Sequence, residues 1–195
     1  MTSETKSLRV LIADDDSLTR LELSQYLDDF GYTVVGQAAD GAVAIDMARS
    51  LTPDLVLMDV KMPETNGIDA ARIITDEKIA PVLLLTAYCE ADLVRRANEA
   101  GVYSYIVKPF SGPALMPQIE VAVARWNAWI QIDQQAADLE EKLETRKAVD
   151  RAKGILMDKH GFREQEAFRR IQVQSMNTRR SMREIAEAII IADNV

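Results

Sequence analysis

Side chains that bind cations or phosphate end several short apolar segments in the N-terminal part of the chain. They are two adjacent carboxylates, a third carboxylate, a hydroxyl and an ammonium: Asp14, Asp15, Asp59, Thr86 and Lys108. Clustered carboxylates repel one another unless a cation neutralises them, and an oxygen-lined cluster with room for water suits Mg²⁺. The whole sequence has one His and one Cys, which makes zinc a poor match.

A carboxylate beside a cation, a lysine and a hydroxyl can hold a phosphoryl group. Mg²⁺ and Lys108 would share the negative charge on the equatorial oxygens of that group, and Thr86 would donate a hydrogen bond to one of them. Asp59 would then be the nucleophile that forms an aspartyl phosphate. Taken alone, Asp59 is more simply explained as a residue that caps the turn after its strand. The chemical interpretation therefore depends on the other residues lying nearby.

These residues meet only if the segments before them are parallel strands of one sheet. Apolar runs bounded by turn residues predict strands at five places: Leu8–Ala13, Thr33–Gly36, Leu55–Asp59, Pro81–Thr86 and Tyr103–Val107. Helical spacing between them predicts helices that begin near Ser17, Gly41, Ile68 and Glu90, the last two ending near Glu77 and Ala100. Alternating strands and helices are typical of a parallel sheet, whose strands bring their carboxyl ends to one edge.

The first predicted helix begins directly after the acidic residues that follow the first strand. Asp16 or Ser17 would cap its start, with Asp16 otherwise adding to the acidic wall, and Gly31 would end it. Its expected apolar face is formed by Leu18, Leu21, Leu23 and Leu27.

The order Asp14-Asp15, Asp59, Thr86 and Lys108-Pro109 on successive strand ends resembles the receiver domain of bacterial two-component response regulators. The resemblance covers about residues 7 to 125. It implies an α/β fold, a doubly wound, flavodoxin-like sheet of five parallel strands in the order 2-1-3-4-5. It also implies that a sensor histidine kinase phosphorylates Asp59, so that the protein is a phosphoacceptor regulator and not an enzyme with an external substrate.

The same resemblance assigns the metal ligands. Asp15 and Asp59 would bind Mg²⁺ directly, together with the backbone carbonyl of Lys61, and Asp14 would act mainly through metal-bound water. An enzyme alternative, a phosphatase or phosphotransferase acting on small molecules, would keep the Asp59 nucleophile. Such hydrolases commonly place a second acid two residues after the nucleophile, and Lys61 stands there instead.

The resemblance further implies a conformational switch. Thr86 would engage a phosphoryl oxygen and Tyr105 would turn inward behind it. The phosphoryl group adds a charge of about −2. Thr86 would then interact more favourably with the phosphorylated Asp59 in one position than in the other, and so would move. The bond between Lys108 and Pro109 is expected to be cis, and X-Pro is the one peptide bond at which cis is accessible.

Composition restricts the class and divides the chain in two. Apolar residues make up 48% of the 195 residues, as in globular proteins, and no apolar run is long enough to span a membrane. The single Cys89 and the polar N-terminus without a secretory hydrophobic region favour a cytoplasmic location. Lys and Arg number 12 against 24 Asp and Glu before Arg146, and 11 against 7 from Arg146 onward. An acidic domain therefore precedes a basic one.

A long helical segment follows the predicted sheet. Apolar residues recur at spacings of three or four from Leu115 through Trp126 to Leu143, with Asp133 interrupting the stripe. One long helix, or two abutting ones, is expected there. Beyond Trp126 the stripe would form a coiled-coil or domain-docking seam, and a homodimer through this linker helix is one expectation.

Three helices are expected at the C-terminal end. The first, through Arg146 to Lys159, would bury Ala148, Ala152, Ile155 and Leu156 and stop at Gly161. The second, about Glu164 to Met176, would bury Ala167, Phe168, Ile171 and Met176. The third opens with Ser181-Met182-Arg183-Glu184, a capping-box pattern, and would bury Met182, Ile185, Ala186 and Ile189. Together they predict a C-terminal three-helix bundle.

This segment resembles the ANTAR domain, the RNA-binding output module of certain transcription antiterminators. The resemblance rests on the run from Arg146 to Met157, on Gly161, on Ala167-Phe168-Arg169 and on Met176 to Met182. Arg163 departs from it, because the pattern favours a capping Ser or Thr there, and Glu164 offsets part of the lost cap. The resemblance implies that the protein binds a hairpin in a nascent transcript and prevents termination.

Candidate RNA contacts are the cationic side chains of the bundle and the one histidine: Arg146, Lys147, Arg151, Lys153, Lys159, His160, Arg179 and Arg180. Phe168 is expected in the core, which argues against a role in stacking on an unpaired base. The domains are expected at residues 7–125 (receiver), 126–144 (helical linker) and 145–193 (RNA-binding). A receiver whose helical tail binds a protein partner, with no RNA target, is the alternative.

Overall fold

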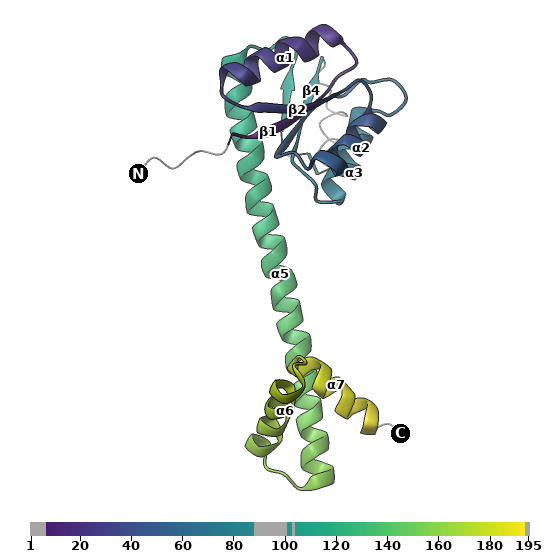
Figure 1. Cartoon of the computed structure of the whole chain (residues 1–195), viewed down its shortest axis with the longest axis vertical. Coiled ribbons are helices and arrows are strands. Elements are labelled where there is room, and N and C mark those ends of the chain that lie inside the picture. The colour runs from purple at the N-terminus through teal and green to yellow at the C-terminus, as the bar shows by residue number, and fades with distance from the viewer. Residues whose placement is uncertain (1–6, 88–100, 103, 194–195) are drawn as a thin grey trace, which may run out of the picture. The chain divides into compact units, whose positions relative to one another are not determined.

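The computed structural model describes residues 7–87, 101–102 and 104–193 (Figure 1). The chain divides into two compact units, Met1–Trp129 and Ile130–Val195, here called the N-terminal and C-terminal units. Helix α5 (Gly112–His160) contributes residues to both units. Among the described residues, no helix combines the length and apolar character that crossing a membrane requires.

The N-terminal unit is built on one parallel sheet. Its strands are β1 (Arg9–Ala13), β2 (Thr33–Ala38), β3 (Leu55–Asp59), β4 (Val82–Thr86) and β5 (Ser104–Val107). They lie in the order β2-β1-β3-β4-β5, and every pairing is parallel. The prediction of a doubly wound five-stranded sheet with this order is confirmed.

Helices cover both faces of the sheet (Figure 1). The described ones are α1 (Ser17–Asp29), α2 (Gly41–Leu51), α3 (Gly67–Asp76) and the start of α5. One buried cluster joins residues of α2 and α3 to alternate strand positions such as Leu11 and Met58, and the other joins α1 and α5 to the intervening positions such as Ile12 and Leu57. Because both faces are covered, β3 and β4 are buried along their whole length.

Several expected boundaries shift by a residue or two. Helix α3 begins at Gly67 and ends at Asp76, since Asn66 accepts a hydrogen bond from the backbone N–H of Ile68 and caps it. Strand β2 extends to Ala38 and β4 begins at Val82, one residue later than expected. The helix expected from Glu90 to Ala100 and the first residue of the expected fifth strand, Tyr103, lie outside the described residues.

The expected apolar face of α1 is wrong at two positions. Leu23 and Leu27 are buried, but Leu18 and Leu21 are 73% and 56% exposed. The buried pair lies four residues apart on one stripe, whereas the helical repeat of about 100° per residue turns Leu18 and Leu21 about 140° and 160° away from Leu23. Asp16, not Ser17, is the N-cap, and its carboxylate accepts from the backbone N–H of Leu18 and the hydroxyl of Thr19.

The C-terminal unit is a small helical bundle. It consists of the last part of α5 with α6 (Glu164–Thr178) and α7 (Met182–Asp193). Its core comprises Val149, Ala152, Ile171, Ile185 and Ala186, with partly buried residues around them. Gly161 has a φ of +68° and ends α5, and Ser181 and Glu184 exchange the hydrogen bonds of a capping box, so both expectations are confirmed.

Three side chains of this unit do not lie where the sequence pattern placed them. Phe168 and Met176 were expected in the core but are 42% and 73% exposed. Helix α6 buries only the narrow stripe of Ala167 and Ile171, and Phe168 is turned about 100° from Ala167 by the helical repeat. Lys153 was expected to be accessible to RNA, yet its side chain is only 16% exposed and bridges Asp150 and Glu164.

Candidate functional site

The carboxyl ends of four strands meet at one edge of the sheet. Asp14 follows β1, Asp59 ends β3, Thr86 ends β4, and Lys108 follows β5. Asp14, Asp59 and Thr86 are buried, with 0%, 7% and 3% of their surface exposed. Parallel pairing of β1 with β3, β3 with β4 and β4 with β5 brings these residues together although they are up to 94 positions apart in the chain.

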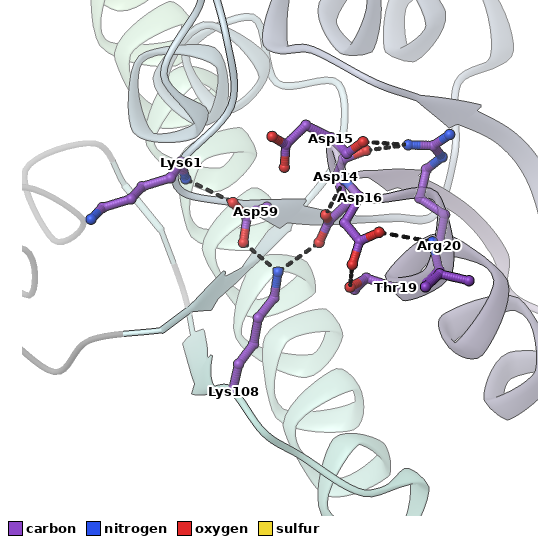
Figure 2. A network of polar contacts seen from close by, with 9 residues as sticks. Asp14, Asp15, Asp16, Thr19, Arg20, Asp59, Lys61 and Lys108 are labelled. Atoms are coloured by element: carbon purple, nitrogen blue, oxygen red, sulfur yellow. Dashed lines mark hydrogen bonds and ion pairs between the residues drawn. The ribbon is translucent and has the colours of Figure 1, made fainter.

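The ammonium of Lys108 lies between two carboxylates (Figure 2). Its Nζ donates to Asp14 Oδ2 at 2.7 Å and to Asp59 Oδ1 at 2.5 Å. The Lys108-Pro109 peptide bond is cis, which confirms the expectation. The backbone N–H of Lys108 also donates to the carbonyl of Thr86 at 2.7 Å, which fixes the start of the loop.

Both oxygens of Asp59 are engaged. Oδ1 accepts from Lys108, and Oδ2 accepts from the backbone N–H of Lys61 at 2.8 Å. Burial raises the pKa of Asp59 above its ordinary value, and the hydrogen bond and charge of Lys108 oppose that rise. For Lys108, burial lowers the pKa, but the bonds to Asp14 and Asp59 outweigh it and leave the pKa above its ordinary value. The ammonium therefore stays charged beside the carboxylates.

The loop between β1 and α1 is held by residues that sequence reasoning did not single out. Arg20 reaches back from α1, and its Nη1 donates to the carbonyls of Asp14 at 2.6 Å and Asp15 at 3.3 Å (Figure 2). The backbone N–H of Asp16 donates to Asp14 Oδ1 at 2.9 Å. A cation one turn after the N-cap is the only sequence signal for Arg20, and by itself it does not show which carbonyls it binds.

Gly67 is a second position whose role became visible only in the structure. A Cβ at Gly67 would overlap the carbonyl oxygen of Asp59, and the backbone N–H of Gly67 donates to the carbonyl of Val60 at 3.0 Å. Helix α3 therefore begins in direct contact with the backbone that carries Asp59. Asn66-Gly67 is a sequence typical of a turn, but the close approach of two backbones at Gly67 is visible only in the structure.

The two residues of the expected switch lie in different surroundings. Thr86 is buried next to the strand end that carries Asp59, since Asp59 is paired with Leu85 in the sheet. Tyr105 lies on β5 and is 38% exposed. In this state the tyrosine ring is not enclosed behind Thr86.

The oxygen donors expected for Mg²⁺ lie at or just after the carboxyl ends of two adjacent strands, β1 and β3. Asp14 and Asp59 share Lys108, Asp15 is exposed beside them, and the side chain of Lys61 points away from Asp59 (Figure 2). Within the described residues, no three His, Cys, Asp or Glu side chains already converge as a metal cage. A donor set of carboxylates and a carbonyl still fits Mg²⁺, which takes one or two carboxylates and keeps several waters.

The residues expected to contact RNA fall into two groups. Arg146, Lys147, Lys153 and Lys159 form ion pairs with acids of their own unit, at distances from 2.5 to 3.8 Å. In the described part of the chain, Arg151, Arg179 and Arg180 form no ion pair, and all three are exposed. The second group is the more available for an external phosphate.

His160, Phe162 and Arg170 form a stack at the turn between α5 and α6. The imidazole lies 5.6 Å from the Phe162 ring with an interplanar angle of 19°, and the Arg170 guanidinium lies 4.1 Å over the same ring. Arg170 and its neighbour Arg169 were not among the expected RNA contacts. Both line a groove of about 890 Å³ between α6 and α7, together with Arg180.

Comparison with known proteins identifies both units. The family model of the response regulator receiver domain matches residues 10–120, and that of the ANTAR domain matches residues 137–190. The transcriptional regulatory protein PdtaR of Mycobacterium tuberculosis is 48% identical over 182 residues, which cover 93% of this chain and 89% of that protein.

Solved structures resemble the N-terminal unit. The signal receiver domain of the response regulator NarL from M. tuberculosis has 27% identity and a TM-score of 0.58, covering 60% of this chain and 97% of that domain. The complex of CheX and CheY with BeF₃ and magnesium from Borrelia burgdorferi has 28% identity and a TM-score of 0.55. The match covers 57% of this chain and 86% of the chain in that complex.

Proposed function

The chain belongs to the response regulators that join a receiver domain to an ANTAR domain, and on that premise we propose that phosphorylation of Asp59 controls RNA-hairpin binding by the C-terminal unit. The outcome would be control of transcription antitermination in the cytoplasm. The observation that carries the proposal is the environment of Asp59, which is buried, bonded to Lys108 and placed beside Asp14.

This geometry suits attack by Asp59 on a phosphohistidine. A carboxylate oxygen of Asp59 forms a bond to phosphorus while the bond from phosphorus to the histidine nitrogen breaks, and the histidine leaves with the nitrogen electron pair. Lys108 compensates charge on the phosphoryl oxygens, and Thr86 lies at the neighbouring strand end to donate a hydrogen bond. Asp14, Asp15, Asp59 and the Lys61 carbonyl would hold Mg²⁺, which shields the same oxygens when bound.

Direct phosphorylation tests the acceptor. The purified chain should incorporate radiolabelled phosphate from a small phosphodonor such as acetyl phosphate, in the presence of Mg²⁺, as an acyl phosphate that hydroxylamine releases. Asp59→Asn should abolish incorporation and leave the far-ultraviolet circular dichroism unchanged. Label persisting on that variant would place the acceptor elsewhere, and loss of wild-type labelling after chelation would support the metal site.

A sensor histidine kinase is the proposed natural donor. Leu18 and Leu21 expose apolar surface on α1, close to the loop that carries Asp14 to Asp16. An exposed apolar patch beside the acceptor is where a protein donor would dock. Leu18→Asp should therefore slow transfer from the cognate kinase and leave transfer from acetyl phosphate unchanged, and equal slowing with both donors would argue against docking there.

The charge of the C-terminal unit supports RNA as the ligand, because 11 Lys and Arg stand against 7 acids from Arg146 onward. Filter binding to hairpin RNA over a salt series separates this from the protein-partner alternative. A phosphate-binding surface should give a negative slope of log affinity against log salt. Absent or salt-independent binding by both phosphorylated and unphosphorylated protein would favour the protein-partner alternative.

A homodimer through the linker is the third part of the proposal. Ile132, Leu139 and Leu143 are 66%, 65% and 52% exposed on α5, at positions that fit alternating steps of three and four with Trp129 and Ala136. We place the receiver at residues 7–125, the linker at 126–144 and the RNA-binding domain at 145–193. Light scattering with and without beryllofluoride tests the dimer, which Leu139→Glu should dissociate.

A further inference from the structure

A hollow of about 650 Å³ opens on the C-terminal unit beside Phe168. Its walls come from the part of α5 around Arg146, from α6 and from the first residue of α7. Val149 and Met182 give it an apolar lining, and Lys142 and Arg146 stand among its cationic side chains. We call it the Phe168 hollow.

Phe168 is exposed because of its position on α6. The neighbouring Ala167 and the following Ile171 face the core and are 0% and 1% exposed, whereas 42% of Phe168 remains accessible. A benzyl side chain this exposed forgoes part of the stabilisation that burial would supply. Fold stability therefore accounts for only part of this side chain, and the exposed part of the ring is available to a ligand with a flat apolar face.

The charged side chains that line the hollow are three cations and two acids: Lys142, Arg146, Lys153, Glu141 and Asp150. Lys153 is fixed by Asp150 and Glu164, each at 2.8 Å, with its side chain only 16% exposed. Arg146 is 81% exposed and lies 3.8 Å from Asp150, a loose contact that it can leave. Arg146 and the exposed Lys142 can thus reach outward, while Asp150 remains at the wall as a hydrogen-bond acceptor.

We propose that the Phe168 hollow receives an unpaired base of an RNA hairpin, stacked on the Phe168 ring, with flanking phosphates on Arg146 and Lys142. This inference rests on the proposed RNA-binding function. Aromatic rings in cationic grooves stack on unpaired bases, and RNA recognition depends largely on such unpaired nucleotides. Asp150 can accept a hydrogen bond from an exocyclic amino group, which would favour cytosine over uracil.

Two other features of the C-terminal unit fit a base less well. The ring of Phe162 already carries the His160 imidazole and the Arg170 guanidinium. The larger groove between α6 and α7 is lined by aliphatic, arginine and uncharged polar side chains and by Glu166, and no aromatic residue lines it in the described part of the chain. Among the aromatic rings described in this unit, Phe168 is exposed and also lines a hollow that contains cationic side chains.

The test uses the full chain and a pool of hairpin RNAs with a constant stem and a randomised loop. A hairpin selected by the wild-type protein is then bound by Phe168→Ala, by Phe168→Tyr and by Val173→Ala, which removes an equally exposed apolar side chain (45%) from α6 outside the hollow. Phe168→Ala should bind about tenfold to a hundredfold more weakly, the range expected for loss of one base–aromatic stack. Phe168→Tyr and Val173→Ala should bind as the wild type does.

Two further readings make the test specific to stacking. The salt dependence of binding should be the same for Phe168→Ala as for the wild type, because no phosphate contact is lost. Binding to the paired stem alone should not respond to Phe168→Ala. Circular dichroism and thermal melting of each variant establish that it is folded.

The outcomes separate the inference from the function on which it rests. If the wild type selects no hairpin, the proposed RNA-binding function is contradicted, and the inference about the Phe168 hollow is contradicted with it. If the wild type binds and Phe168→Ala binds equally well, or Phe162→Ala alone weakens binding, only the inference is overturned. A change of oligomeric state in Phe168→Ala with unchanged hairpin affinity would also overturn it, and would assign the hollow to a second copy of the chain.

Discussion

Lys108 of the receiver and Lys153 of the C-terminal unit each bridge two carboxylates, but in different surroundings. The partners of Lys108 come from two strand ends, and their side chains are 1% and 10% exposed. The partners of Lys153 lie on α5 and at the start of α6, and their side chains are 53% and 69% exposed. Similar bridges therefore join buried carboxylates in one unit and exposed carboxylates in the other.

The difference follows from dielectric surroundings. A buried carboxylate that loses its partner is strongly destabilising, so removal of Lys108 would act directly on Asp59, the proposed phosphoacceptor. Ion pairs between exposed side chains are screened by water and salt and contribute little, so Arg146, which lies 3.8 Å from Asp150, can exchange that acid for an external phosphate at small cost.

The largest expected effect is on phosphoryl transfer. Lys108→Ala removes the ammonium that compensates charge at Asp59, and the rate of labelling by acetyl phosphate should fall roughly a hundredfold to a thousandfold. The matched changes Lys153→Ala and Lys61→Ala should leave the rate unchanged, since the backbone donor of Lys61 is retained. Equal rates in Lys108→Ala and wild type would remove the distinction between the two lysines.

The small core of the C-terminal unit should be the more easily broken. Ile171→Ala deletes most of a buried side chain and should lower the free energy of unfolding of this unit by about 2–4 kcal/mol. Urea unfolding separates the units, because both tryptophans of the sequence, Trp126 and Trp129, lie in the N-terminal unit. In Ile171→Ala, part of the unfolding transition followed by circular dichroism of the helices should move to a lower urea concentration. The transition followed by tryptophan fluorescence should stay at the same urea concentration. A parallel shift of both would show that the units unfold together.

Loss of a cation without an internal ion pair should weaken RNA binding moderately. Arg151→Ala and Arg180→Ala should each reduce hairpin affinity several-fold and reduce the salt slope by about one. Lys159→Ala should have less effect, since Lys159 already pairs with Asp193 at 2.5 Å. Arg72→Ala on the receiver provides a control of equal charge change. Unchanged affinity in both arginine variants would move the site elsewhere on the bundle.

The smallest expected effect concerns the capping box of α7. Hydrogen bonds from Ser181, first from its backbone N–H, lower the pKa of Glu184. Because the folded pKa lies below the unfolded one, this stabilisation is present above the unfolded pKa of Glu184 and is lost as pH falls through the folded pKa. Thermal melting at a series of pH values across the range in which carboxylates titrate should show this loss of stability in the wild type and not in Glu184→Gln. Identical pH profiles would assign the loss to other acids.

The receiver could be anticipated from sequence to a large extent. The meeting of Asp14, Asp59, Thr86 and Lys108 followed from apolar runs that each end in a polar residue, because parallel strands place those ends on one edge. The strand order followed from the resemblance to receiver domains. What could not be anticipated were backbone contacts at the same edge. Arg20 binding to two carbonyls and Gly67 touching the Asp59 backbone depend on loop geometry that no periodicity encodes.

The C-terminal unit was anticipated less fully. Helix ends followed from Gly161 and Ser181, whose roles are local. Which faces are buried depended on packing between helices, and in so small a bundle the buried stripe is narrow, so Phe168 and Met176 were wrongly placed inside. Ion pairs across helices, such as Lys153 with Glu164, likewise require the packed arrangement.

Coupling between the two units is the central claim, and one measurement tests it directly. Affinity of the full chain for its selected hairpin is measured with and without beryllofluoride and Mg²⁺, in wild type and in Asp59→Asn. The wild-type affinity should change by about fivefold or more, the range of ordinary coupling free energies, and the Asp59→Asn affinity should not change. Equal wild-type affinity in both conditions, with beryllofluoride binding verified, would contradict control of RNA binding by Asp59.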